Sequence, residues 1–537
     1  MGVGSFSLPI IANQFTYTYP SDWVSITGVP NNEIFLCNSD EGTATVAFTV
    51  TTSASTYNVD WGDGTSTTGI TSNTIAQKTY TYGSGQTGTT NPGVTTFKAR
   101  IYATSGTITR FFISRASNTG SNQLQPIYAA NFGTTGLTSM ANAFFLSSAS
   151  VSSALQSVQL PSTLNSVGSF ASAFEGCRRL RNVQFPTSVT GVTTMSRTFF
   201  NCNSLQYLTL SQTTFSNSFT MANMMQGCTS LERIDFPNIL NGVTSMTFAL
   251  NSCSSLTIPN LPSSVTGCTN FNNMMGGCVS LQNVTFPTSL HPSSGIDFAQ
   301  MFDGCTSLQN FTFPAGALRA SSLAATFNNN LALNWVVFPT TLNNLTLAST
   351  TFSDCANLSY VSMPTSMSII TNVNAMFRRC NSLSNITLPT MPLLTNANEL
   401  FNTCFGLKTI NGLSGIGRTS SSTVSMGVGF IFQTELLTTN VSIAAYLSSL
   451  EIIGSSATVR NGVTSIRLTN ATSPFTGSSP QVNVSWTSLG QSALVDLFND
   501  LPTLTSKTIN ITGASGAAAL TAPERAIATG KGWTITG

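Results

Sequence analysis

The sequence predicts a mixed, β-rich fold, in which a β-sandwich is followed by a solenoid of parallel strands with short helices and then by a solenoid cap. Three observations support this prediction. One short pattern recurs about eleven times between Met140 and Leu413, with a period of ~25 residues. Apolar residues alternate with polar ones before it, and strand-like segments follow it. A fixed period in the twenties indicates repeats that bury their apolar side chains against their neighbours.

The region before the repeats divides into two parts. Residues 1–39 contain scattered aromatic residues and prolines without a regular period, and we interpret them as an N-terminal arm. In residues 40–128 the apolar residues alternate, as in Val46, Phe48 and Val50, and turn residues separate the short runs. This pattern predicts a β-sandwich.

Two segments of the sandwich region carry a resemblance. Asp60-Trp61-Gly62-Asp63-Gly64 is followed later by Thr79-Tyr80-Thr81-Tyr82. Together they resemble the PKD-type immunoglobulin-like domain, although the second segment lacks that family's usual His. The resemblance implies an Ig-like spacer or binding module without a reaction. Asp60 and Asp63 leave a calcium site open as an alternative to a purely structural turn.

The repeats follow one order of residues. Phe302-Asp303-Gly304-Cys305 precedes Leu308 and an apolar-x-apolar pair that ends at Pro314. Pairs at i, i+4, such as Met195 and Phe199, predict a short helix, and the alternating segment after the Leu predicts a parallel strand that the Pro ends. Residues 129–413 are therefore predicted to form the solenoid. We expect its leucines to be stacked inside, namely Leu205, Leu231, Leu281, Leu308, Leu358 and Leu383.

This repeat pattern resembles the BspA-type leucine-rich repeat, which occurs in bacterial and protist surface proteins and in phage particles. One repeat position holds a cysteine nine times, and Asn330 replaces it once. We interpret this position as a buried ladder of reduced thiols. Disulfides between neighbouring rungs and a metal site are the alternatives. The ladder consists of Cys177, Cys202, Cys228, Cys253, Cys278, Cys305, Cys355, Cys380 and Cys404.

Residues 414–537 are predicted to form a C-terminal, repeat-like cap. A helix is predicted over Ser492–Leu501, and Thr521 with Glu524 forms a capping box at the start of another helix. Strands are predicted at 482–484, 509–511 and 533–535, about one repeat apart.

Composition limits the function. Charged residues make up 7% of the chain and the net charge is +2, against about 25% charged residues in ordinary soluble domains. The absence of a basic stripe argues against a nucleic-acid partner. No stretch reaches the roughly 18 apolar residues of a membrane span, and the start of the chain lacks the features of a signal peptide. We therefore expect no membrane span and no export by a signal.

Catalysis is not expected either, and no cofactor or metal is predicted. The one histidine, His291, precedes a proline in a loop, unlike a buried catalytic histidine. Glycosidases need two carboxylates across a cleft. The candidate pairs, Asp297 with Asp303 and Glu232 with Asp235, have spacings that suit a solvated edge better.

The sequence therefore favours a non-enzymatic structural or adhesion protein of a phage particle, such as a head or tail appendage or fibre. It resembles phage repeat proteins in having the Asp-Trp-Gly-Asp-Gly segment before the repeats and in its ending, Lys531-Gly-Trp533. We expect it in the virion in many copies, contacting particle proteins through its N-terminal region and a host-surface glycan or protein through the repeats. The alternatives are a bacterial cell-surface adhesin or filament subunit outside the cell and, thirdly, a carbohydrate-active enzyme. Candidate binding residues are Tyr207, Trp335, Tyr360, Arg178 and Arg378.

Overall fold

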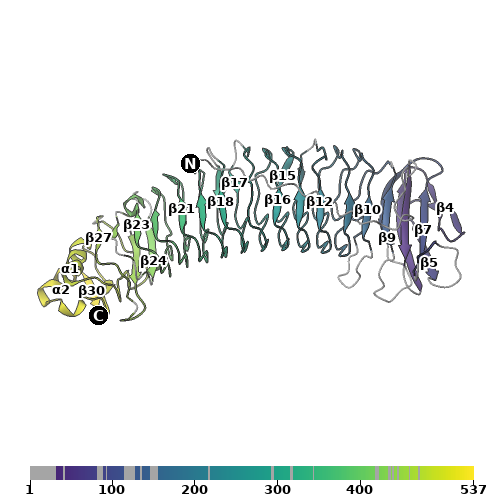
Figure 1. The fold of residues 1–537 in the computed structure, drawn as a ribbon. Coiled ribbons are helices and arrows are strands. Elements are labelled where there is room, and N and C mark those ends of the chain that lie inside the picture. Colours follow the sequence, from purple (N-terminus) through teal and green to yellow (C-terminus); the bar gives the residue numbers. More distant parts are fainter. Residues whose placement is uncertain are drawn as a thin grey trace, which may run out of the picture.

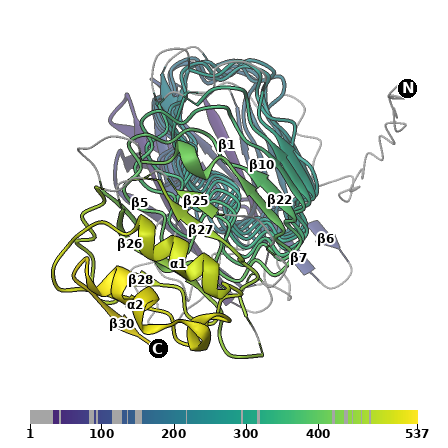
Figure 2. The ribbon, with the colours of Figure 1, turned by 90° about the vertical axis from the view of Figure 1, so that its left-hand side faces the viewer.

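The protein is an elongated, arched body that begins with antiparallel sheets, continues as a long stack of coils and ends in a region with helices (Figure 1). Seen along its length, the coils overlie one another (Figure 2). The computed structural model describes residues 32–39, 43–81, 89–91, 94–113, 127–133, 136–145, 155–215, 218–291, 295–314, 319–342, 344–417 and 423–537, apart from 433, 435–436, 438–440, 444, 446, 459 and 470–471. Within them, no helix is long and apolar enough to cross a membrane.

Two antiparallel sheets share one core at the N-terminal end. Phe48 of one sheet lies 5.8 Å, measured between ring centroids, from Trp61, the residue that directly follows a strand of the other sheet. The rings of Tyr80 and Phe97 stack at 4.7 Å. Tyr80 Oη also donates a hydrogen bond to the Trp61 carbonyl at 2.8 Å. The first sheet contains β1 (Glu33–Ser39), β3 (Thr56–Asp60), β4 (Ser66–Thr71), β6 (Thr89–Asn91) and β7 (Val94–Tyr102), and the second contains β2 (Thr43–Thr52), β5 (Ile75–Thr81) and β8 (Ile108–Ile113).

The last part of the predicted N-terminal arm, residues 1–39, is a strand of the first sheet instead. Residues Glu33–Ser39 form a strand that pairs antiparallel with β7 and buries Ile34 and Leu36. The alternation in this short segment covers too few residues to stand out from the irregular sequence before it, and both of its partner strands are distant in sequence. The remainder of the predicted arm, 1–31, lies outside the described residues.

The first sheet continues directly into the stack of coils. Strand β9 (Ile127–Phe132) pairs antiparallel with β1 on one side and parallel with β10 (Ser157–Gln159) on the other. Strand β10 then pairs parallel with β11 (Asn182–Gln184). An uncovered first coil would expose both an apolar face and unpaired backbone groups. The continuous sheet removes that exposure.

Most coils of the stack contribute short strands that pair in parallel with those of adjacent coils, as predicted, whereas residues 281–287, in the coil of Leu281, form no strand. The six leucines expected inside the solenoid are all buried, which confirms their placement. The main sheet positions are β12 (Tyr207–Thr209), β14 (Arg233–Asp235), β16 (Ile258–Asn260), β18 (Asn310–Thr312), β20 (Trp335–Val337), β21 (Tyr360–Ser362), β22 (Asn385–Thr387) and β23 (Thr409–Asn411). A second line of strands comprises β13 (Phe219–Thr220), β15 (Val243–Ser245), β17 (Ile296–Asp297) and β19 (Ala320–Ser322).

The predicted short helices are wrong: among the described residues from 155 to 411, the structure contains no helix, and tight turns occupy the predicted positions. Two backbone positions of each coil are left-handed, as at Gln300 (φ 56°) and Gly304 (φ 71°). These positions interrupt the helical hydrogen-bond pattern, so some turn amides bond across to the next coil. The Phe302 amide, for example, donates to the Thr326 carbonyl at 2.9 Å. Two consecutive tight turns therefore produce the i, i+4 spacing that resembled a helix.

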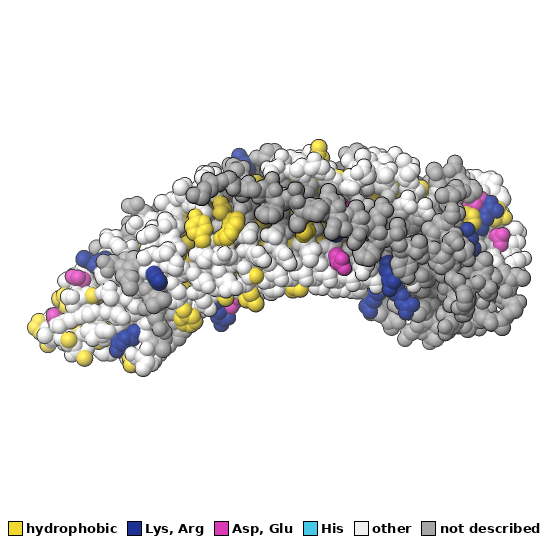
Figure 3. All heavy atoms as spheres, viewed as in Figure 1, with side chains coloured by type: hydrophobic (Ala, Val, Ile, Leu, Met, Phe, Trp, Pro, Cys, Tyr) yellow, Lys and Arg dark blue, Asp and Glu magenta, His cyan; other side chains and the backbone are white. Residues whose placement is uncertain are grey.

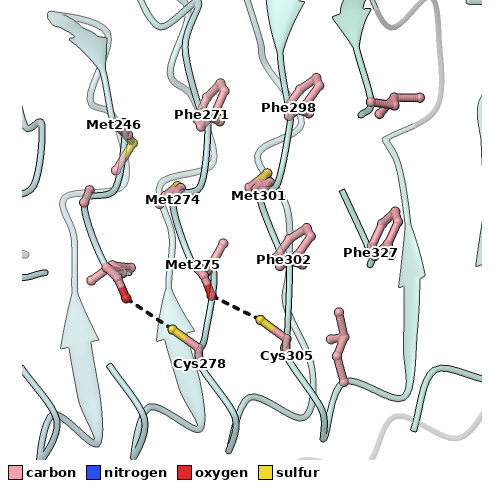
Figure 4. Packing of buried hydrophobic residues seen from close by; sticks show 14 of the residues in the cluster. Met246, Phe271, Met274, Met275, Cys278, Phe298, Met301, Phe302, Cys305 and Phe327 are labelled. Atoms are coloured by element: carbon pink, nitrogen blue, oxygen red, sulfur yellow. Dashed lines mark hydrogen bonds between the residues drawn. The ribbon is translucent and has the colours of Figure 1, made fainter. Parts of the chain in front are cut away.

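Aromatic side chains stack from coil to coil inside the turns. The ring of Phe327 lies 5.5 Å from that of Phe302 and 5.5 Å from that of Phe352, with interplanar angles of 14° and 4°. Figure 4 shows Phe302 and Phe327 side by side, with Phe271 and Phe298 in a parallel line. Because the rings repeat at the same place, each coil provides the apolar surface on which the next one packs.

The C-terminal region keeps the parallel stacking and adds helices. The predicted helix over Ser492–Leu501 is present one residue earlier, and the second helix begins at the predicted capping box, where the Thr521 amide donates to Glu524 Oε2 at 2.7 Å. Lys531 Nζ donates to the Asn499 and Leu501 carbonyls at the end of the first helix, at 2.6 and 2.8 Å. The elements are η1 (Leu413–Gly415), β24 (Val424–Phe432), β25 (Val441–Ile443), β26 (Leu447–Ile453), β27 (Ile466–Leu468), β28 (Val482–Asn483), α1 (Gln491–Asp500), β29 (Lys507–Asn510), η2 (Ala517–Ala519), α2 (Ala522–Thr529) and β30 (Trp533–Thr536).

The left-handed turn positions generate a stability prediction. Thr403 has φ 57°, a conformation that is costly for a β-branched residue. We expect Thr403→Gly to raise the free energy of unfolding by about 0.5 to 1 kcal/mol. Glycine removes the backbone strain of the folded state, and this gain is partly offset because glycine also increases the entropy of the unfolded chain. The measurement is the midpoint of urea denaturation.

Gly304 provides the matched control, because it occupies the same position of another coil. A Cβ there would meet no atom closer than 4.0 Å, so Gly304→Ala tests the backbone strain without a clash. We expect it to lower the midpoint. If Thr403→Gly also lowered the midpoint, strain at this position would not limit stability.

Candidate functional site

The outward face of the main sheet is the candidate site. In each strand the middle residue is directed inward, while the first and third are directed outward. Thus Val336 is fully buried, whereas Trp335 and Val337 on either side of it are half-buried. We call the first residues of these strands the first row and the third residues the second row. The first row is Tyr207, Arg233, Ile258, Asn310, Trp335, Tyr360, Asn385 and Thr409, and the second is Thr209, Asp235, Asn260, Thr312, Val337, Ser362, Thr387 and Asn411.

Three of the predicted binding residues lie in the first row. Trp335 and Tyr360 are register partners in adjacent strands, and Tyr207 lies further toward the N-terminal end. The exposed fractions are 46% for Tyr207 and 55% for Tyr360. Ile258, which the sequence analysis did not select, is 61% exposed in the same row. Aligning the repeats by their strand positions would have identified it.

The two predicted arginines lie elsewhere. Arg178 directly follows the ladder residue Cys177, and Arg378 lies two residues before Cys380. The guanidinium of Arg378 forms ion pairs with Asp354 at 3.3 Å and Glu399 at 3.6 Å, which offset its charge. Arg178 is exposed. The structure therefore separates the predicted binding residues into an aromatic group on the sheet and basic residues near the cysteine corner.

Asp235 organises the polar part of the sheet face. Tyr207 Oη donates to its Oδ2 at 2.6 Å, Arg233 Nε donates to its Oδ1 at 2.9 Å, and Asn260 Nδ2 donates to the same Oδ1. Burial acts to raise the pKa of Asp235, but these hydrogen bonds and the Arg233 charge outweigh it and hold that pKa below its ordinary value. A carboxylate with this many donors is a structural anchor. It is poorly suited to accept a proton in a reaction.

The other candidate carboxylates are also engaged locally. Asp297 Oδ1 accepts a hydrogen bond from the Ala299 amide at 2.9 Å, and Asp303 Oδ1 accepts one from Asn328 at 2.9 Å. In the N-terminal sheets, Asp63 accepts from the Thr65 amide at 3.0 Å and pairs with Lys78 at 2.9 Å. These contacts are what a structural turn requires. The described part of the chain contains no group of three or more His, Cys, Asp and Glu placed to hold a metal ion.

The nine ladder cysteines are buried, and none forms a disulfide in the structure. Their sulfurs donate to carbonyls of the preceding coil, as Cys305 Sγ does to the Met275 carbonyl at 3.1 Å (Figure 4). Burial raises the pKa of Cys228 and Cys278 to about 12, so these thiols keep their protons at neutral pH. The repeat position therefore requires a small side chain that can donate a hydrogen bond.

Asn330 fits this requirement only in part. Its Nδ2 donates to the Phe302 carbonyl at 2.9 Å, as a thiol would. Its buried Oδ1, however, has no hydrogen-bond partner among the described residues. An unsatisfied buried acceptor costs about 1 to 3 kcal/mol, so the asparagine should stabilise the array less than a cysteine would.

We therefore expect Asn330→Cys to stabilise the protein by about 1 kcal/mol, because it keeps the donor and removes the unsatisfied oxygen. Urea denaturation under reducing conditions measures the change. The reverse substitution at a neighbouring rung, Cys305→Asn, should lower the midpoint. Stabilisation by both substitutions would contradict this explanation of the ladder.

Asp235 gives a prediction that depends on pH. Its folded-state pKa lies below the ordinary value of 3.8, so its contribution is present above about pH 4 and is lost as pH falls through the folded-state pKa. Asp235→Asn should cost about 1 kcal/mol at pH 7 and progressively less in acid. Denaturation midpoints across this range test the expectation. The exposed neighbour Glu232 supplies the control, since Glu232→Gln should change the midpoint little at any pH. If Asp235→Asn lowered the stability equally at all pH values, the ionised carboxylate of Asp235 would not be the cause.

The sequence of the repeats matches a known family. The family described as BspA type Leucine rich repeat region matches residues 138–274, 225–324 and 298–425 in 6 copies. A leucine-rich repeat protein from Bacteroides ovatus ATCC 8483 is 18% identical, with 60% of this chain and 90% of that chain covered and a TM-score of 0.30. One from Eubacterium ventriosum ATCC 27560 is 18% identical, with 58% and 90% covered and a TM-score of 0.31. No curated protein matched the chain. Because the family matches span more than half of the chain, the protein belongs to the BspA-type leucine-rich-repeat family.

Proposed function

We propose that this chain is a non-enzymatic structural and adhesion protein of a phage particle, a head or tail appendage or fibre, and that its sheet face binds a partner. The observation that carries the proposal is the exposure of apolar first-row side chains on an otherwise polar face. Ile258 and Tyr360 are more than half exposed, and such side chains are characteristic of contact surfaces. Their positions on a rigid sheet favour recognition over catalysis.

The architecture supports a display role. The sheet shared by β1, β9 and β10 ties the N-terminal sheets to the array through backbone hydrogen bonds. A PKD-like, Ig-like sandwich at that end would act as the base that contacts other particle proteins, and the array would extend away from it (Figure 1). The pairing of such a base with these repeats is what favours the virion over a bacterial cell surface. Many copies on one particle would multiply weak individual contacts.

Mass spectrometry of purified particles of a phage whose genome encodes the chain tests whether the protein is part of the virion. We expect its peptides to remain with the particles through density-gradient purification, at a copy number comparable to that of other appendage proteins. A non-structural phage protein from the same lysate serves as the control. Recovery of the chain only from bacterial cell-surface fractions would instead support the alternative, a cell-surface adhesin.

The sheet face also predicts the salt dependence of binding. Few charges are available on the two rows, and Arg233 and Asp235 compensate each other at 2.9 Å. Binding of the purified chain to host envelope preparations should therefore change little between low salt and about 0.5 M salt, since few exposed ion pairs would be screened. Collapse of binding over this range would contradict the proposal, as would turnover of a polysaccharide by the purified chain.

A further inference from the structure

The central part of the sheet face combines two neighbouring aromatic residues with neutral polar ones. Trp335 and Tyr360 are direct register partners in β20 and β21, so their side chains leave the same face one rung apart. Tyr360 is 55% exposed and Trp335 is half-buried. Figure 3 shows hydrophobic side chains grouped on the part of the face where β18 and β21 lie in Figure 1.

Amide side chains flank this aromatic pair along the first row. Asn310 is the register partner of Trp335 on one side, and Asn385 lies one coil beyond Tyr360 on the other. The second row adds Thr312, Ser362 and Thr387. From β16 to β23, every first-row and second-row residue of the described strands is uncharged. The only charged residues in the two rows, Arg233 and Asp235, lie in β14 and bind each other.

From these observations, and resting on the proposed function, we infer that the face around Trp335 and Tyr360 binds a neutral polysaccharide that runs along the array, across successive rungs. A pyranose ring presents an apolar C–H face, which can pack on an aromatic ring, and hydroxyl groups around its rim. Amides both donate and accept hydrogen bonds, so Asn310 and Asn385 suit those hydroxyls at the two ends of the pair.

The repeat spacing supports this orientation. Neighbouring strands lie about 4.8 Å apart, which is comparable to the length of one sugar ring in an extended chain. A polysaccharide along the array would therefore meet a new rung with about each sugar. The repeating sugars of such a polymer would thus meet the repeating strands of the sheet at similar intervals.

Other partner classes fit this part of the face less well. A polyanion would need the basic residues that nucleic-acid and phosphate sites use, and these rows contain none between β16 and β23. An amphipathic helix would need a continuous apolar groove, whereas the aromatic pair is bordered by amides. The hydroxyl-rich surface instead complements a ligand that is neutral and polar around its edges.

The site is also rigid before any ligand binds. Val336 and Val361, the middle residues of the two strands, are buried. Between the strands, Ser359 Oγ donates to Asn334 Oδ1 at 2.6 Å, and the Tyr360 amide donates to the Asn334 carbonyl at 3.3 Å. The two aromatic side chains thus extend from a fixed backbone, which lowers the entropy cost of binding.

The test is affinity electrophoresis of the full chain in gels that contain a soluble β-glucan, a mannan or a galactan. We expect retardation by at least one of these neutral polymers, unchanged by salt. Trp335→Ala and Tyr360→Ala should each weaken that interaction by about tenfold, and Trp335→Phe should retain part of it. Phe405→Ala is the matched control, because it removes an exposed aromatic side chain that follows the ladder residue Cys404 and lies outside the two rows. Thermal midpoints of all variants verify folding.

The possible results distinguish failure of this inference from failure of the proposed function. Failure of all three neutral polymers to bind overturns the inference, and so does preferential binding of an acidic polysaccharide that salt abolishes. If Trp335→Ala weakens binding to a host or particle protein but to no polysaccharide, the partner is a protein, and the proposed adhesion function survives without the glycan. If mass spectrometry does not find the chain in phage particles, the proposed location is wrong, but binding of a neutral polysaccharide would still support this inference.

Discussion

The structure depends on hydrogen bonding between coils. Each coil has two left-handed turn positions, as at Gln300 and Gly304, and no helix in which to satisfy its backbone internally. Some of its amides bond within the turns, as the Cys305 amide does with the Phe302 carbonyl, but others find a partner only when a second coil lies beside it, as the Phe302 amide does with the Thr326 carbonyl. A single coil would leave these groups unpaired, and unpaired buried groups are costly. Formation of the array is therefore cooperative, and both of its ends require a covering.

The two ends meet that requirement differently. At the N-terminal end, β9 turns the parallel ladder into an antiparallel one, so the first coils join a sheet that has its own core. At the C-terminal end, parallel strands continue to β30, while α1 and α2 pack on each other and add apolar surface. Lys531 satisfies the terminal carbonyls of α1. The same need for covered ends thus explains both the added sheets and the late appearance of helices.

The sequence predicted the features that repeat and missed those that depend on register. Spacing alone identified the buried leucines and the cysteine ladder, and local signals located α1 and the capping box of α2. The helix prediction failed because i, i+4 spacing does not distinguish a helix from two tight turns, and only the left-handed φ angles do. The Asp235 cluster was missed because Tyr207 and Asn260 lie one coil away on either side. Sequence separation hides such contacts until the strands are aligned.

Stability and recognition are assigned to different positions of the coil. The turn and ladder positions form bonds to both neighbouring coils, so a poor substitution there, such as the asparagine at position 330, leaves an unsatisfied group in the interior. The side chains of outward residues such as Ile258 and Tyr360 are exposed, and these residues join the neighbouring coils through their backbone groups. Their identity can change at small cost in stability. A scaffold of this kind can therefore alter what it binds along the sheet without altering the hydrogen bonding that holds the coils together.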